Sequence, residues 1–285
     1  MKSGIVSILN LKNGVGCSCL AWNIAHTLQL NLYQHDKAMH HTYNAKRKET
    51  LEDDMESILP YMIQIHPIIK NRFDRGVYDL GSDFNYAHIK KIIGISEVII
   101  IPCELGHETL VKTIATLRFI SALETNAKIF VVINKLLPLS SFEREGRYTQ
   151  DAKELIEEHS NVKVVFFYMR HSFFLFRYLD AGFFFLDNYI VQADIKINHK
   201  TRPSIKPFEL LQHIKNISDI MKNKNIARKK LKMGKVNPEN TFQSSIKTQP
   251  SADVIDSSLV FKNSRAIKDM FILTTDIKEV LGEVC

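Results

Sequence analysis

Short apolar runs alternate with amphipathic segments along the first two thirds of the chain. Runs rich in Val, Ile and Leu predict strands that are buried on both faces, and apolar positions three and four residues apart predict helices. Strands are expected at 4–9, 75–80, 98–101, 127–133 and 162–167. Helices are expected at 18–30, 86–93, 109–123 and 150–159.

This alternation of strand and helix predicts an α/β fold, a doubly wound, mostly parallel sheet with helices on both faces. Ligands of such sheets bind at the carboxyl ends of the strands. The informative loops therefore follow Leu9, Leu80, Ile101 and Ile133.

The pattern changes after residue 206. We expect an α/β domain over 1–206, a basic helix over 207–235, a polar linker over 236–257 and a helical C-terminal appendage over 258–285. Basic side chains on the helix are candidates for contacts with DNA phosphates, and the alternative is a solvated helix face. These candidates are Lys222, Lys224, Arg228, Lys229, Lys230 and Lys232.

Composition changes this picture little. Of the 285 residues, 45% are hydrophobic, and the net charge of +7 permits contact with nucleic acid or anionic lipid without requiring it. The four cysteines form no CxxC pair and no zinc-site spacing, which favours a reducing, cytoplasmic compartment. No apolar stretch reaches the length that a transmembrane helix needs, and a membrane partner is not expected.

The first predicted loop carries candidate chemistry. Two glycines there allow unusual backbone conformations and a close approach of amides to an anion, and the positive end of the following helix points to the same place. The candidate phosphate-binding residues are Asn13, Gly14, Val15, Gly16, Cys17, Ser18 and Cys19. The Ser18 hydroxyl is also a candidate magnesium ligand. The alternative is an ordinary glycine-containing turn between strand and helix.

The segment Lys12-Asn13-Gly14-Val15-Gly16-Cys17-Ser18-Cys19 resembles the deviant Walker A loop of the ParA/MinD family of P-loop ATPases, K-G-G-V-G-K-[ST]-[ST]. The following L-A-W-N-I-A-H-T-L is similar to the family's L-A-x-N-L-A-x-x-L. The resemblance implies ATP and Mg²⁺ as cofactors, and a homodimer in which Lys12 reaches the nucleotide of the partner subunit. It also implies a role in plasmid partition or positioning, with non-specific DNA and an adaptor protein as partners.

One departure from the family concerns catalysis. Cys17 stands where the family has the lysine that contacts the β- and γ-phosphates, and a neutral thiol cannot replace that charge. A helix N-terminus lowers a cysteine pKa, and the alternative at this position is a thiolate, whose negative charge would repel phosphate. Weak or absent ATP hydrolysis follows. The alternative is a nucleotide-independent pseudo-ATPase that acts as a regulatory or scaffold protein.

Three further segments resemble the family. Phe73 to Gly81 is similar to its Walker B region, with Asp79 as a magnesium ligand or, alternatively, a turn cap. Residues 128–135 resemble its V-V-x-N-[RK] strand end, which implies that Asn134 reads the adenine, although asparagine is also an ordinary turn residue. Tyr33-Gln34-His35-Asp36 is the best match to its D-x-D strand end, with Gln34 in the first aspartate position and Asp36 as the catalytic candidate.

Overall fold

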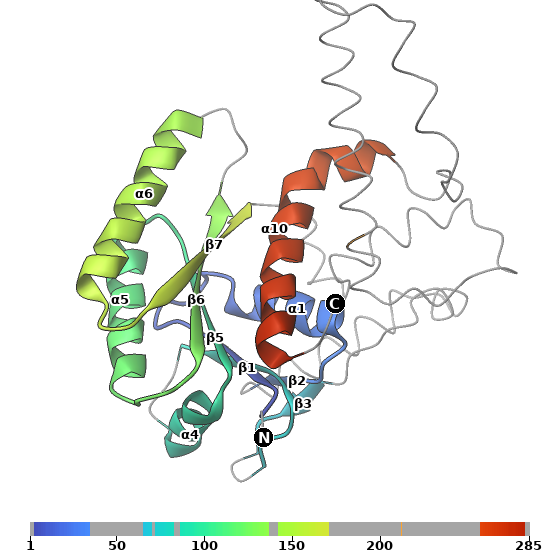
Figure 1. Cartoon of the computed structure of the whole chain (residues 1–285), viewed down its shortest axis with the longest axis vertical. Coiled ribbons are helices and arrows are strands. Elements are labelled where there is room, and N and C mark those ends of the chain that lie inside the picture. Colours follow the sequence, from blue (N-terminus) through green and yellow to red (C-terminus); the bar gives the residue numbers. More distant parts are fainter. Residues whose placement is uncertain are drawn as a thin grey trace, which may run out of the picture.

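A computed structural model describes residues 3–34, 65–69, 72–82, 86–136, 142–170, 212 and 257–282 (Figure 1). The strands are β1 (Ile5–Leu9), β2 (Leu32–Gln34), β3 (Ile65–Pro67), β4 (Gly76–Gly81), β5 (Val98–Cys103), β6 (Lys128–Leu136) and β7 (Val164–Arg170). The helices are α1 (Cys17–Leu28), α4 (Ala87–Ile95), α5 (His107–Ser121), α6 (Phe142–His159) and α10 (Ser257–Leu281).

The strands form one seven-stranded sheet in the order β3-β2-β4-β1-β5-β6-β7, and every pairing of neighbours is parallel. The predicted α/β class with a parallel sheet is therefore confirmed. β1 lies in the middle, between β4 and β5. The loop that follows β1 consequently opens at the centre of the carboxyl edge, where parallel α/β sheets bind ligands.

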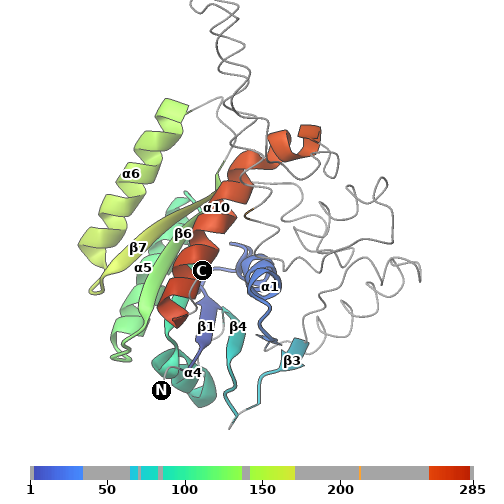
Figure 2. The same ribbon diagram turned by 45° about the vertical axis from the view of Figure 1, so that its right-hand side comes forward.

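Helices cover both faces of the sheet. α1 and α10 lie on one face, and α4, α5 and α6 lie on the other (Figure 2). Alternate residues of β1 serve the two layers, since Val6 and Ile8 belong to the core under α1 and α10, whereas Ile5 and Leu9 belong to the core under α4 and α5. This double burial explains why the strand is apolar at every position except Ser7.

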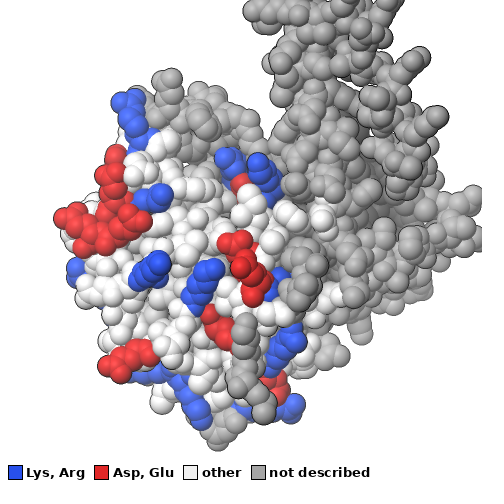
Figure 3. Space-filling view, viewed as in Figure 1, with Lys and Arg blue, Asp and Glu red and all other residues white. Residues whose placement is uncertain are grey.

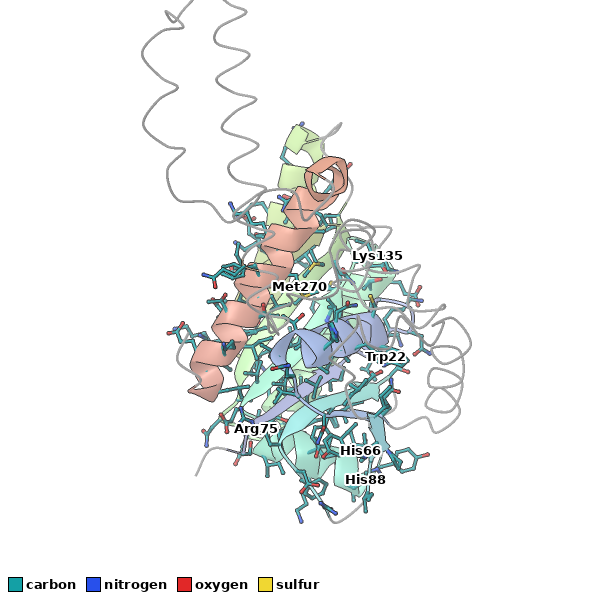
Figure 4. The ribbon with its side chains drawn as sticks, turned by 90° about the vertical axis from the view of Figure 1, so that its right-hand side faces the viewer. Trp22, His66, Arg75, His88, Lys135 and Met270 are labelled. Atoms are coloured by element: carbon teal, nitrogen blue, oxygen red, sulfur yellow. The ribbon has the colours of Figure 1, made fainter. Side chains whose placement is uncertain are left out.

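The helix expected at 258–285 spans Ser257–Leu281 and packs directly on the sheet. Met270 and Leu273 are fully buried and share one core with Trp22 of α1, and Figure 4 labels Met270 and Trp22 where the two helices meet. Arg170 at the end of β7 donates to Asp269 of α10 twice, from its backbone N–H at 3.0 Å and from Nη1 at 2.6 Å. These contacts make α10 part of the sheet's packed core.

The two strands β2 and β3 have three residues each and do not appear among the strands expected from apolar runs. α6 begins at Phe142, eight residues before the expected start of its helix. The expected basic helix and polar linker lie outside the described residues, apart from Gln212. Among the described helices, none is both long enough and apolar enough to cross a membrane.

Charges of both signs are interspersed on the face seen in Figure 3. The acidic side chains at its left belong to α6, where the exposed carboxylates are Asp151, Glu154, Glu157 and Glu158. The described part of this face therefore presents no continuous basic surface.

A candidate phosphate-binding loop at the carboxyl end of β1

The loop between β1 and α1 has the backbone of an anion cradle. Gly14 has φ of +80° and Gly16 has φ of +99°, a left-handed region that other residues rarely enter. Gly16 is the N-cap of α1, and no side chain caps the first turn of this helix. The amides at the start of α1 and the helix dipole therefore face the loop, as in phosphate sites.

Buried polar side chains fix the start of the loop to β5 and α5. Asn10 donates from Nδ2 to the Pro102 carbonyl at 2.7 Å and to Thr113 Oγ1 at 2.9 Å. Its Oδ1 accepts the Lys12 N–H at 2.9 Å, and Thr116 Oγ1 accepts the Leu11 N–H at 3.1 Å. Asn10 and both threonines are fully buried. This network holds the loop in shape before any ligand arrives, and sequence motifs did not identify it.

The end of β6 fixes the middle of the loop. Asn134 donates from Nδ2 to the Val15 carbonyl at 2.8 Å, and its Oδ1 accepts the Lys135 N–H at 2.9 Å. Lys135, which Figure 4 labels, donates from Nζ to the Gly14 carbonyl at 2.6 Å. The side-chain nitrogen and oxygen of Asn134 thus both form hydrogen bonds within the protein. The sequence resemblance had predicted that this side chain contacts adenine. Lys135 belongs to the site and was missing from the sequence candidates.

Two lysines beside the loop each contact a glutamate. Glu104 lies in the segment that joins β5 to α5, and Glu108 lies in the first turn of α5. Lys12 Nζ lies 3.0 Å from Glu108 Oε1, and Lys135 Nζ lies 2.6 Å from Glu104 Oε1. Both pairs are partly exposed, so each contributes about 0.2–1 kcal/mol. Lys12 would have to leave Glu108 to reach a nucleotide in a partner subunit.

Of the two states considered for Cys17, the structure favours the neutral thiol over the thiolate. Burial raises the pKa of the Cys17 thiol far above its usual range, and the neighbouring Asp79 carboxyl raises it further. These two effects outweigh the lowering by the backbone hydrogen bond at the start of α1. Burial also raises the pKa of Cys19, whose side chain lies in the core beneath α1. Position 17 therefore presents a neutral thiol to the loop.

Asp79 lies near the carboxyl end of β4, beside the loop. Gln34 donates to Asp79 Oδ2 from Nε2 at 3.2 Å, and the Ser18 side chain lies nearby. Burial raises the pKa of Asp79, and the neighbouring Ser18 and Gln34 side chains oppose the rise. Among the described residues, nothing forms a hydrogen bond with the buried Asp79 Oδ1. A hydroxyl and a carboxylate with an unused oxygen fit Mg²⁺, which prefers oxygen ligands and keeps several positions for water and phosphate.

The structure thus brings together the residues of the loop, Ser18, Asp79 and Asn134. The catalytic candidate Asp36 lies outside the described residues, as do the six DNA-binding candidates between Lys222 and Lys232.

The chain resembles several solved structures. A plasmid partition protein from Borrelia burgdorferi B31 bound to AMPPNP shares 17% identity, with a TM-score of 0.46 over 66% of this chain and 93% of that one. A ParA family ATPase from Chlorobium tepidum TLS shares 13% identity, with a TM-score of 0.44 over 65% and 90%. Apo McdA from Cyanothece shares 12% identity, with a TM-score of 0.43 over 65% and 92%. No family model matches the chain, and no curated protein matches it.

Proposed function

We propose that this chain is a ParA-like partition or positioning protein that binds ATP with Mg²⁺ at the loop after β1 and hydrolyses it weakly or not at all. One observation carries the proposal. The loop, with two glycines in the left-handed region, lies beside the oxygen atoms of Ser18 and Asp79. The position from which a lysine would contact the phosphates holds the neutral Cys17.

Binding and turnover depend on different parts of this site. Backbone amides and the dipole of α1 attract phosphate without any side-chain charge. A lysine would add a charge-assisted hydrogen bond worth roughly 1.5–3 kcal/mol, and it would act most strongly where charge builds up in the transition state. Cys17 supplies neither effect, so ground-state binding survives better than hydrolysis.

Ser18 and Asp79 are the residues that would hold Mg²⁺. When bound, the ion supplies positive charge to the β- and γ-phosphate oxygens. The protein's own contribution is to hold the loop amides in place through Asn10 and Asn134, and to hold the Asp79 carboxyl group in place through the hydrogen bond from Gln34.

We extend the proposal to a cytoplasmic homodimer. Lys12 leaves Glu108 and contacts the nucleotide of the second copy, which the partial exposure of the pair allows. Non-specific DNA binds through the basic residues between Lys222 and Lys232, and an adaptor protein regulates the complex. The wholly different candidate is a scaffold protein that keeps the fold and binds no nucleotide, and the replacement of the loop lysine by Cys17 is the observation that favours it.

The test is equilibrium binding of a fluorescent ATP analogue with Mg²⁺, with phosphate release followed in the same samples. Wild type is compared with Ser18→Ala, Lys12→Ala and the control Lys163→Ala, which removes an exposed lysine at the opposite end of the sheet. We expect micromolar binding with little phosphate release, weakened by Ser18→Ala and unchanged by Lys163→Ala. Lys12→Ala is expected to reduce nucleotide-dependent dimerisation. No binding by wild type at millimolar analogue would refute the proposal in favour of the scaffold.

A further inference from the structure

Gln34 is the last residue of β2, and it lies next to Asp79, the candidate magnesium ligand on β4. β2 and β4 pair in parallel, and Gln34 is the register partner of Asp79. Only 3% of Gln34 and 6% of Asp79 are exposed. The contact is made by Gln34 Nε2, which donates to Asp79 Oδ2 at 3.2 Å. A buried amide and a buried carboxyl thus share one hydrogen bond beside Ser18.

Each of these two side chains keeps one oxygen unused. Gln34 Oε1 and Asp79 Oδ1 are buried, and neither has a hydrogen-bond partner in the part of the chain that the structure describes. An unpaired buried polar group costs roughly 1–3 kcal/mol, so proteins normally satisfy such atoms. Two unsatisfied oxygens on touching side chains, next to a hydroxyl, form the donor set of a hard cation.

We propose that the Gln34 side-chain oxygen is a third protein ligand of the divalent cation held by Ser18 and Asp79. This inference rests on the proposed function, because the cation is the one that would accompany the nucleotide. The Nε2 hydrogen bond holds the amide against Asp79, and Oε1 contacts the ion. The ligand set then carries one negative charge, so a hard divalent ion such as Mg²⁺ or Mn²⁺ binds weakly alone and more tightly with phosphate.

The competing explanation gives Gln34 a purely restraining role. If its hydrogen bond only occupied Asp79, removing the amide would release the carboxylate, and the cation would bind equally well or more tightly. If Gln34 is a ligand, removing its oxygen weakens cation binding. The direction of the change therefore separates a ligand from a restraint.

The experiment measures free Mn²⁺ by electron paramagnetic resonance during titration of the full chain, first with Mn²⁺ alone and then with ADP present. Wild type is compared with Gln34→Met, which keeps the length of the side chain and removes the oxygen. The matched control is Gln150→Met, the same change at an exposed position on α6. We expect about a ten-fold weaker Mn²⁺ affinity for Gln34→Met, and no change for Gln150→Met. Gln34→Glu, which keeps an oxygen at the same length, is expected to bind Mn²⁺ at least as tightly as wild type.

Thermal melting checks that each variant folds. If Gln34→Met loses its cooperative transition, Gln34→Asn carries the same expectation, because it withdraws the oxygen by one methylene. The inference is overturned if wild type binds no Mn²⁺ at millimolar concentration, or if neither Gln34→Met nor Gln34→Asn weakens binding. Mn²⁺ binding that follows the expectation without any effect of ADP refutes the nucleotide function and leaves the cation site standing. If ADP strengthens Mn²⁺ binding equally in wild type and Gln34→Met, the nucleotide function stands and Gln34 is not a ligand.

Discussion

Replacing Cys17 by lysine tests whether the loop is a phosphate site that lacks one charge. Cys17 is the first residue of α1 after the N-cap Gly16, and its half-buried thiol lies close enough to Asp79 for that carboxyl to raise its pKa. A lysine here would place an ammonium group between Asp79 and a bound phosphate. The charge-assisted hydrogen bond to phosphate is worth roughly 1.5–3 kcal/mol, which corresponds to about 10- to 150-fold tighter nucleotide binding.

The same substitution has a cost without ligand. The thiol packs against the core under α1 and α10, and a longer side chain must direct its charged end outward along the loop. We expect the free protein to lose about 1 kcal/mol, a fall of roughly 2–4 °C in melting temperature. Nucleotide should reverse this loss, because a ligand that binds only the folded state stabilises it.

The assay is fluorescence titration of the ATP analogue with Mg²⁺ at two salt concentrations, with phosphate release measured in parallel. Cys17→Met is the control, because it extends the side chain without adding charge. Cys17→Lys should bind tightest, its advantage should shrink as salt rises, and its phosphate release should increase. If Cys17→Lys binds no better than Cys17→Met at low salt, no phosphate lies at the start of α1 and the reasoning fails.

Three other outcomes follow from the geometry. Glu108→Gln releases Lys12 from its carboxylate and should tighten nucleotide binding roughly two- to five-fold at low salt, the range for a partly exposed pair, whereas Glu157→Gln on α6 should leave affinity unchanged. Because burial raises the pKa of Cys17 above that of an unfolded thiol, the folded state holds its proton more tightly, and stability is lost as pH rises above about 8.5. The free energy of unfolding, measured with urea from pH 7 to pH 10, should therefore decrease less steeply with pH for Cys17→Ser than for wild type. Equal decreases in the two proteins would contradict a raised pKa at Cys17. Asp269→Asn removes the charge that ties α10 to β7 and should cost about 1–3 kcal/mol of unfolding free energy; an unchanged urea midpoint would mean that the pair does not anchor the helix.

The sequence predicted those elements whose burial pattern is local. β1, apart from Ser7, and β5 are apolar because both faces are covered, and that pattern is visible in the chain itself. β2 and β3 are too short for a period to emerge, and β3 has only one buried residue. The core role of α10 depends on contacts with α1 and β7, which lie far away in the sequence, so its amphipathic pattern predicted a helix without its place.

The candidate site divides in the same way. The glycines, Ser18 and Asp79 were identified because phosphate and magnesium chemistry requires these residue types in a fixed order. Asn10 and Lys135 were not identified, because their roles come from hydrogen bonds to loop atoms across the sheet edge. The sequence left the state of the Cys17 thiol open for a related reason. The helix N-terminus is a local feature, whereas the burial that outweighs it comes from tertiary packing.

The charges around the loop explain why a cation is central to this site. Lys12 and Lys135 contact Glu108 and Glu104, so within the described residues each lysine at the loop already faces a carboxylate. Cys17 adds no charge, and Gln34 contributes an amide beside Asp79. A nucleotide that arrived alone would meet backbone amides and a buried carboxyl group, whereas a nucleotide with Mg²⁺ brings the charge that Asp79 and the phosphates both lack. Cation and nucleotide should therefore bind together, each weakly without the other, and the unpaired oxygens of Asp79 and Gln34 mark where they meet.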